Sequence, residues 1–102
     1  EVYCAPCHGL VGSGDGMVAR RAEALAQGGW VPPSDLNQPY IRAQPVGALF
    51  ASVSGGVRTM PAYGQLVPAD ERWRIILFVR ALQRRSAASL ADVPADQRPA
   101  LE

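Results

Sequence analysis

All of the cysteine and histidine in the chain lies in one pentapeptide, Cys4-Ala5-Pro6-Cys7-His8, and this concentration constrains the possible folds most strongly. The chain also contains 10 glycines and 9 prolines in 102 residues, which predicts many loops. A short chain rich in loops has a small hydrophobic core and usually needs disulfides, a metal ion or a cofactor for stability. Because two cysteines cannot form a disulfide network, we expect the stabilising group to be held at the pentapeptide.

The overall composition indicates a single globular domain and excludes several classes of function. Apolar residues make up 48% of the chain, and its formal net charge is +1. All 10 basic residues are arginines, scattered apart from the pairs Arg20-Arg21 and Arg84-Arg85, so no nucleic-acid interface is expected. No apolar run approaches the length of a membrane span, so we expect no transmembrane segment in this chain. Because the pentapeptide begins at the fourth residue, we expect the chain to follow a processed or absent leader.

Three chemistries of cysteine and histidine fit the pentapeptide poorly. A zinc site needs about four protein ligands, and the three present here are too close together in the chain to surround the metal. A disulfide between cysteines three residues apart closes a small loop and stabilises little. A thioredoxin-type redox pair, the main rival, follows a strand and opens a helix in a βαβ unit. Only Glu1, Val2 and Tyr3 precede Cys4, and we expect no strand there.

Covalent haem attachment fits the pentapeptide, because it has the C-x-x-C-H spacing. Cys4 and Cys7 would form thioether bonds with the two vinyl groups on one edge of the porphyrin. His8 would then lie under the iron as its proximal ligand, and Gly9 would let the backbone pass close to the ring. We therefore expect one haem c, bound through Cys4 and Cys7, with its iron ligated by His8.

The second axial ligand of such a haem is commonly a methionine. Met17 follows His8 by only nine residues, so a loop to the opposite face would have to pass round the ring edge. We expect Met17 to be an ordinary loop or helix-start residue. Met60 is far enough along the chain to close over that face, and Pro61 stiffens the turn after it. Filling a gap in the core is the ordinary alternative for a methionine, but we expect Met60 to be the sixth ligand.

The chain is expected to be all-α, since no segment shows sustained strand alternation. Helices are predicted over residues 17–27, 45–54 and 68–85, with a helical turn over 36–42 and a glycine-rich loop over 9–16. In the longest helix Val67 is a poor cap and Pro68 suits the first helical position, while Asp70 and Glu71 suit the positive end. On a helical wheel this helix is apolar on most sides, which predicts burial on most sides.

Over residues 1–85 the sequence resembles class I cytochromes c. The likeness rests on the motifs YCAPCHG, GSGDG, the DL pair, GALFASVSGG, TMPAYG and ERWRIILFVRALQ. It implies a small all-α fold wrapped around one covalent haem, with haem-packing roles for Leu36, Pro61 and Trp73. The closest likeness is to the monohaem subunit of alternative complex III, a membrane quinol-oxidising complex that delivers electrons to periplasmic carriers or oxidases. The family's N-terminal helix is reduced here to its last turn, and the lysine cluster of mobile mitochondrial-type carriers is missing.

The resemblance implies a one-electron transfer protein rather than an enzyme, with iron cycling between ferrous and ferric states. It implies redox proteins as partners and a place in a respiratory or photosynthetic quinol-oxidising membrane complex, on the periplasmic side of a bacterial membrane. Two alternatives stay open. One is a freestanding periplasmic carrier, and the other is a haem enzyme or sensor whose sixth ligand leaves the iron.

Several residues outside the main motifs have both a functional and an ordinary interpretation. Arg58 and Trp30 are candidates for contact with the haem propionates, but they are also typical of a solvated loop and of loop packing. Tyr63 is a candidate lid of the haem pocket. Residues 86–102 form a tail poor in large apolar residues. This tail is either disordered or an arm laid over a neighbouring subunit, with anchors at Leu90, Val93 and Leu101.

Overall fold

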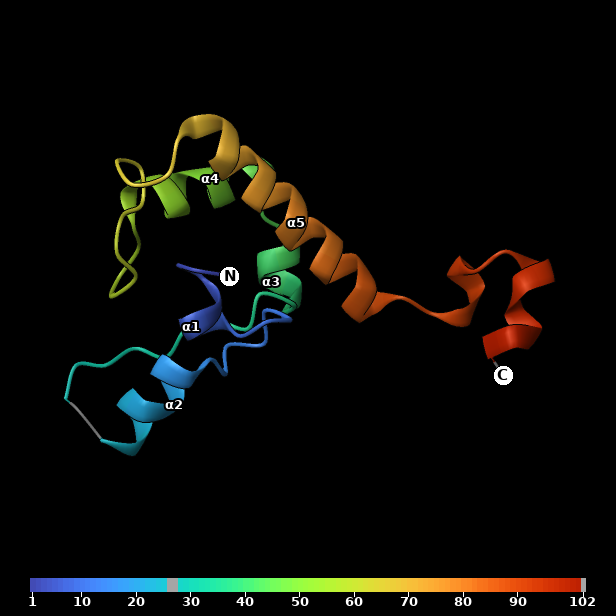
Figure 1. Cartoon of the computed structure of the whole chain (residues 1–102), viewed down its shortest axis with the longest axis horizontal. Coiled ribbons are helices and arrows are strands. Elements are labelled where there is room, and N and C mark those ends of the chain that lie inside the picture. Colours follow the sequence, from blue (N-terminus) through green and yellow to red (C-terminus); the bar gives the residue numbers. More distant parts are fainter. Residues whose placement is uncertain (26–27, 102) are drawn as a thin grey trace.

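The structure is a computed structural model that describes residues 1–25 and 28–101, and these residues form helices joined by loops (Figure 1). The helices are α1 (Ala5–His8), α2 (Met17–Ala24), α3 (Pro39–Arg42), α4 (Val46–Gly55) and α5 (Ala69–Ala87), followed by the 3-10 helices η1 (Leu90–Asp92) and η2 (Ala95–Leu101). In the described ranges the β structure consists of one isolated bridge, between Val57 and Met60. The prediction of an all-α fold is confirmed.

The longest helix, α5, differs from its prediction at both ends. Pro68 is the N-cap and not the first helical residue, because its ψ of 152° is extended. The helix therefore begins at Ala69 and continues to Ala87, two residues beyond Arg85. Its charges lie as predicted, with Asp70 and Glu71 in the first turn and two arginines in the last turn.

The shorter helices are also shifted from their predicted bounds. The helix expected over 45–54 covers Val46–Gly55 and ends at Gly56, whose φ of 77° is in the left-handed region. The helix expected over 17–27 begins at Met17 but ends at Ala24, and residues 26–27 lie outside the described residues. The turn expected over 36–42 is limited to Pro39–Arg42, because Gln38, the residue before Pro39, is extended with a ψ of 146°.

The hydrophobic core lies where α3, α4 and α5 meet. Ile41, Leu49 and Ile76 are its buried members, one from each helix, and three half-buried side chains pack against them: Leu36, Phe50 and Val53. This core is small, and the chain exposes 7045 Å² of surface. A compact protein of 10.9 kDa exposes about 5,600 Å². The protein side chains alone therefore leave much apolar surface uncovered.

A buried polar network holds α5 to the segment around α3. Gln83 is only 4% exposed, and its Nε2 donates to the Leu36 carbonyl at 2.7 Å. Its Oε1 accepts a hydrogen bond from Arg80 Nη1 at 2.9 Å. Arg80 also donates to the carbonyls of Arg42, at 3.0 Å, and Gln44, beyond the end of α3. The network satisfies both polar atoms of the Gln83 side chain and caps α3.

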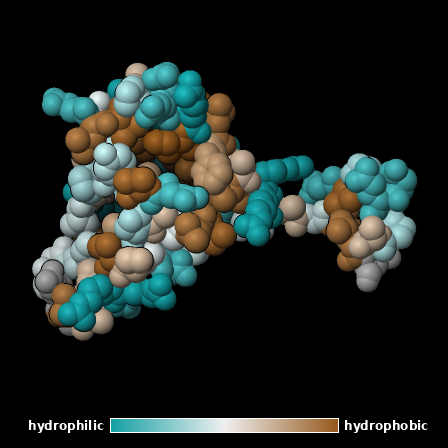
Figure 2. All heavy atoms as spheres, in the orientation of Figure 1, coloured by the Kyte–Doolittle hydropathy of each residue, from teal (hydrophilic) through white to brown (hydrophobic). Residues whose placement is uncertain are grey.

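The predicted burial of α5 on most sides is not observed. Ile76 is 2% exposed, but Leu77 and Phe78, the next two residues, are 66% and 59% exposed. Apolar side chains gather on the surface over α4 and α5 (Figure 2). Among the described helices, none combines the length and the apolar character needed to cross a membrane.

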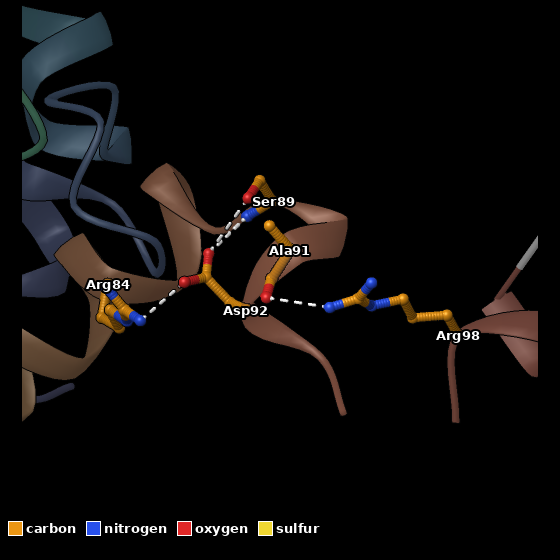
Figure 3. Close-up of polar contacts among 5 residues, drawn as sticks. All are labelled: Arg84, Ser89, Ala91, Asp92 and Arg98. Atoms are coloured by element: carbon orange, nitrogen blue, oxygen red, sulfur yellow. Dashed lines mark hydrogen bonds and ion pairs between the residues drawn. The ribbon is translucent and has the colours of Figure 1, made fainter. Parts of the chain in front are cut away.

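The tail after α5 forms a compact turn of its own and extends away from the other helices (Figure 1). Asp92 accepts hydrogen bonds from the Ser89 amide at 2.8 Å and from Arg84 at 2.8 Å (Figure 3). Arg98 donates to the carbonyls of Val93 at 2.8 Å and Ala91 at 3.4 Å. The described part of the tail thus contains two 3-10 helices, η1 and η2, linked by these side-chain hydrogen bonds.

Candidate functional site

The predicted haem-attachment motif forms the single helical turn α1. Cys4 is its N-cap, and the His8 amide donates to the Cys4 carbonyl at 2.8 Å. Pro6 is accommodated because backbone amides in a first helical turn have no intrahelical partner. Cys4 and Cys7 are three residues apart on this turn, and both thiols are half-buried and unbonded. The described residues contain no group of three or more Cys, His, Asp or Glu side chains able to hold a bare metal ion.

A glycine-rich loop folds over the carboxyl end of α1. The Gly14 amide donates to the His8 carbonyl at 2.7 Å, and the Gly16 amide donates to the Cys7 carbonyl at 2.9 Å. A side chain at residue 16 would collide with the Pro6 carbonyl. Gly9 has a φ of 81°, and a Cβ there would lie 2.5 Å from an oxygen of Asp15. Glycine is therefore required at residue 9 by the conformation and the packing of the loop.

The imidazole of His8 is held by a backbone acceptor from a distant segment. Its Nδ1 lies 3.1 Å from the Ser34 carbonyl oxygen. Since a carbonyl only accepts, Nδ1 carries the proton and Nε2 is left as the free donor atom for a metal. The Ser34 segment is fixed in turn, because Asn37 Nδ2 donates to the Val11 carbonyl at 3.2 Å.

Met60 lies in a tight loop between α4 and α5. Val57 and Met60 exchange two backbone hydrogen bonds, of 3.2 and 2.8 Å. Gly56 is needed before the loop, because a Cβ there would lie 2.7 Å from the Met60 carbonyl oxygen. The Met60 side chain is half-buried, and Thr59 Oγ1 donates to the Val31 carbonyl at 3.3 Å. The loop is thus held at its tip by the segment that follows Trp30.

The comparisons with known proteins decide the family. A family model described as "Cytochrome C oxidase, cbb3-type, subunit III" matches residues 1–79. The chain belongs to this family. It is a monohaem class I cytochrome c, which carries covalent haem c and transfers electrons. No curated protein gives a significant match to the chain.

The residues of this cytochrome fit a covalent haem. The two unbonded thiols lie on one turn beside His8, whose free Nε2 suits an iron atom. The indole Nε1 of Trp30 is buried and has no hydrogen-bond partner among the described residues. A buried indole N–H usually has such a partner, and a haem propionate would supply one. Arg58 is exposed and directly precedes Thr59, whose hydroxyl donates to the Val31 carbonyl next to Trp30.

The other predicted site residues of the cytochrome lie in varied surroundings. Leu36 packs against the core, and Pro61 is exposed after Met60. Trp73 is 42% exposed and stacks on Phe50, with ring centroids 4.0 Å apart. Met17 is the first residue of α2 and is 71% exposed.

Two titratable side chains of the cytochrome have shifted pKa values near the motif. Before haem attachment, burial raises the pKa of the Cys4 thiol; the α-amino group of Glu1 opposes this rise and Cys7 adds to it. Burial also raises the pKa of Tyr63, with smaller contributions from Cys4, Cys7 and Tyr3. The Tyr63 ring also packs against Tyr3, the residue before Cys4, with ring centroids 5.4 Å apart.

Sequence reasoning missed two residues that organise the site. Ser34 acts through its backbone carbonyl, which every residue type offers, so no side-chain pattern marks it. Gln83 lies just before two arginines, in a stretch whose polar composition is typical of an exposed helix end, but its side chain is buried. The sequence signal for its burial was that this polar residue falls in register with the apolar positions of α5.

Proposed function

We propose that the haem iron of this cytochrome is ligated by His8 and Met60 and that the domain carries one electron at a time. The contact between His8 Nδ1 and the Ser34 carbonyl, at 3.1 Å, carries this proposal. It fixes the tautomer and the ring orientation that an iron ligand needs. Met60 supports the proposal because two backbone hydrogen bonds hold it in a rigid loop.

In the proposed mechanism the haem, when bound, supplies a one-electron couple between ferrous and ferric iron. Cys4 and Cys7 hold the ring to α1, and the glycine-rich loop keeps that turn in place. A thioether ligand at Met60 favours the ferrous state and raises the potential. Leu36, Pro61 and Trp73 would exclude water from the ring, and Trp30 would donate to a propionate. A firmly held Met60 favours electron transfer over an enzyme or sensor that binds ligands at iron.

We further propose that the domain works within a membrane respiratory complex. The family takes its description from a subunit of a terminal oxidase, which supports a place in a respiratory complex. The finer assignment is to a quinol-oxidising complex of the alternative complex III type, on the periplasmic side, passing electrons to a periplasmic carrier or oxidase. The exposed Leu77 and Phe78 on α5 support contact with another subunit.

The domain organisation in this proposal is a haem domain over residues 1–85 and a tail over 86–102 that holds the subunit in its complex. Leu90 and Leu101 are 43% and 66% exposed in the tail and are the proposed anchors together with Val93. Deleting residues 88–102 leaves α5 whole and removes the tail. We expect an unchanged haem spectrum and weaker co-purification with the complex. If the truncated protein and the full chain co-purify equally well with the complex, the anchoring role of the tail is contradicted.

The ligand assignment is tested by comparing Met60→Ala with Met17→Ala in the holoprotein. Axial ligands move haem potentials over roughly 0.8 V, so we expect Met60→Ala to lower the potential by more than about 100 mV. It should also abolish the far-red absorption band of a thioether bound to ferric iron. Met17→Ala, at an exposed methionine, should change neither property. The reverse result would assign Met17 as the ligand.

A further inference from the structure

Two tyrosines join the haem-binding turn to the loop that holds Met60. The rings of Tyr3 and Tyr63 lie with their centroids 5.4 Å apart and their planes tilted by 47°. Aromatic pairs favour centroid separations of 4.5–7 Å in such inclined arrangements, and a pair of this kind changes an equilibrium about 2- to 13-fold. The contact crosses between segments separated by 60 residues in the sequence.

Each ring is attached to a different ligand-bearing segment. Tyr3 directly precedes Cys4, so haem attachment at Cys4 fixes the backbone next to it. Tyr63 follows Met60 by three residues, and its own backbone is held firmly. Its amide donates to the Val53 carbonyl at 2.9 Å, and its carbonyl accepts from the amide of the buried Val67 at 2.9 Å. The Tyr63 ring therefore projects from the α4–α5 scaffold onto the residue beside the first thiol.

The contact between the two tyrosine rings restricts how the loop that carries Met60 can move. The tip of the loop is held by the bond from Thr59 to Val31, and its far end is held at Tyr63. Arg58 and Pro61, on either side of Met60, are exposed and add little packing of their own. Swinging the whole segment from Met60 to Tyr63 away from Tyr3 would separate the two tyrosine rings and break the hydrogen bond from Tyr63 to Val53.

We propose that Tyr3 and Tyr63 are positioning residues that form an aromatic clasp, which keeps the Met60 loop closed over the haem and Met60 on the iron. This inference rests on the proposed ligation by His8 and Met60. The clasp does not ligate the iron. Its two rings connect the segment that carries His8 with the segment that carries Met60. It lowers the population of the open state, in which another ligand can bind to ferric iron.

The test uses imidazole as the exogenous ligand and the ferric holoprotein. We expect Tyr3→Ala to increase the apparent affinity for imidazole about 2- to 13-fold and to speed amide hydrogen exchange at Met60 by a similar factor. Tyr3→Phe keeps the ring and should restore both values. Val2→Ala, at the neighbouring residue that is 78% exposed, is the matched control. Equal haem content per chain in all variants shows that attachment is unaffected.

A double-mutant cycle with Tyr63→Ala separates the clasp from effects of either ring alone. The clasp predicts that Tyr3→Ala has little further effect once Tyr63 is truncated. Independent effects that multiply, or an imidazole affinity of Tyr3→Ala equal to that of Val2→Ala, would overturn the clasp. If Met60→Ala loses the far-red band while Tyr3→Ala behaves as wild type, the clasp alone is wrong. A far-red band that survives in Met60→Ala overturns the ligation and the clasp together.

Discussion

Replacing Gln83 with leucine should destabilise the cytochrome, although leucine is apolar and of similar size. Gln83 is 4% exposed and makes two side-chain hydrogen bonds, to the Leu36 carbonyl at 2.7 Å and from Arg80 at 2.9 Å. Leucine removes both bonds and leaves the Leu36 carbonyl without its partner. A stranded buried acceptor costs about 1–3 kcal/mol. Arg80 keeps its bonds to the carbonyls of Arg42 and Gln44, so we expect a loss of about 2 kcal/mol in the free energy of unfolding.

Urea denaturation of the holoprotein, followed by far-ultraviolet circular dichroism, measures this loss. With a slope of about 1–3 kcal/mol/M, the midpoint should fall by roughly 1 M. Gln97→Leu in the exposed helix η2 is the matched control and should change the free energy by less than about 0.5 kcal/mol. A Gln83→Leu protein as stable as wild type would refute the reasoning, because it would show that the Leu36 carbonyl needs no partner.

Three further predictions concern the core, the tail and the haem. Ile76→Ala should cost about 2–5 kcal/mol in urea denaturation, whereas Leu77→Ala at the exposed next residue should cost less than about 0.5 kcal/mol. The Ser89 amide and then Arg84 lower the pKa of Asp92 below its ordinary 3.8, so its stabilisation of the tail is present above that value and lost as pH falls further. The protection factor of the Ser89 amide, its intrinsic exchange rate divided by the observed rate at the same pH, should therefore fall as pH drops below 3.8, and Asp92→Asn should remove this pH dependence. Haem-free protein should show no cooperative thermal unfolding by circular dichroism, because the side-chain core is small; a sharp transition would contradict this.

The features that the sequence predicted are those set by local chemistry. The end of α4 at Gly55 and Gly56 was predictable because glycine readily adopts the positive φ observed at Gly56. The charges of α5 lie at the ends that its dipole favours. The haem motif needs only five residues in a fixed spacing, so its chemistry was readable before any fold was known.

The features that the sequence did not predict depend on contacts between distant segments. The Ser34 carbonyl meets His8 only because loops 9–16 and 30–38 pack together, and a backbone acceptor has no residue signature. The apolar pattern of α5 also could not tell which face would be buried. Ile76 is buried while Leu77 is exposed, and the difference is set by where α3 and α4 lie. The start of α5 was placed one residue too early because proline suits the first helical position, whereas the extended ψ of 152° makes Pro68 the N-cap.

The central claim is that Cys4 and Cys7 bind one haem through thioether bonds and that His8 holds its iron. A pyridine haemochrome spectrum of the holoprotein, with haem quantified per chain, tests it most directly. Saturation of both vinyl groups shifts the absorption band of the ferrous complex to shorter wavelength than that of haem with free vinyls. We predict this full shift, with one haem per chain that stays attached after extraction with acid and organic solvent. A spectrum of unmodified haem, or haem lost on extraction, would contradict the account.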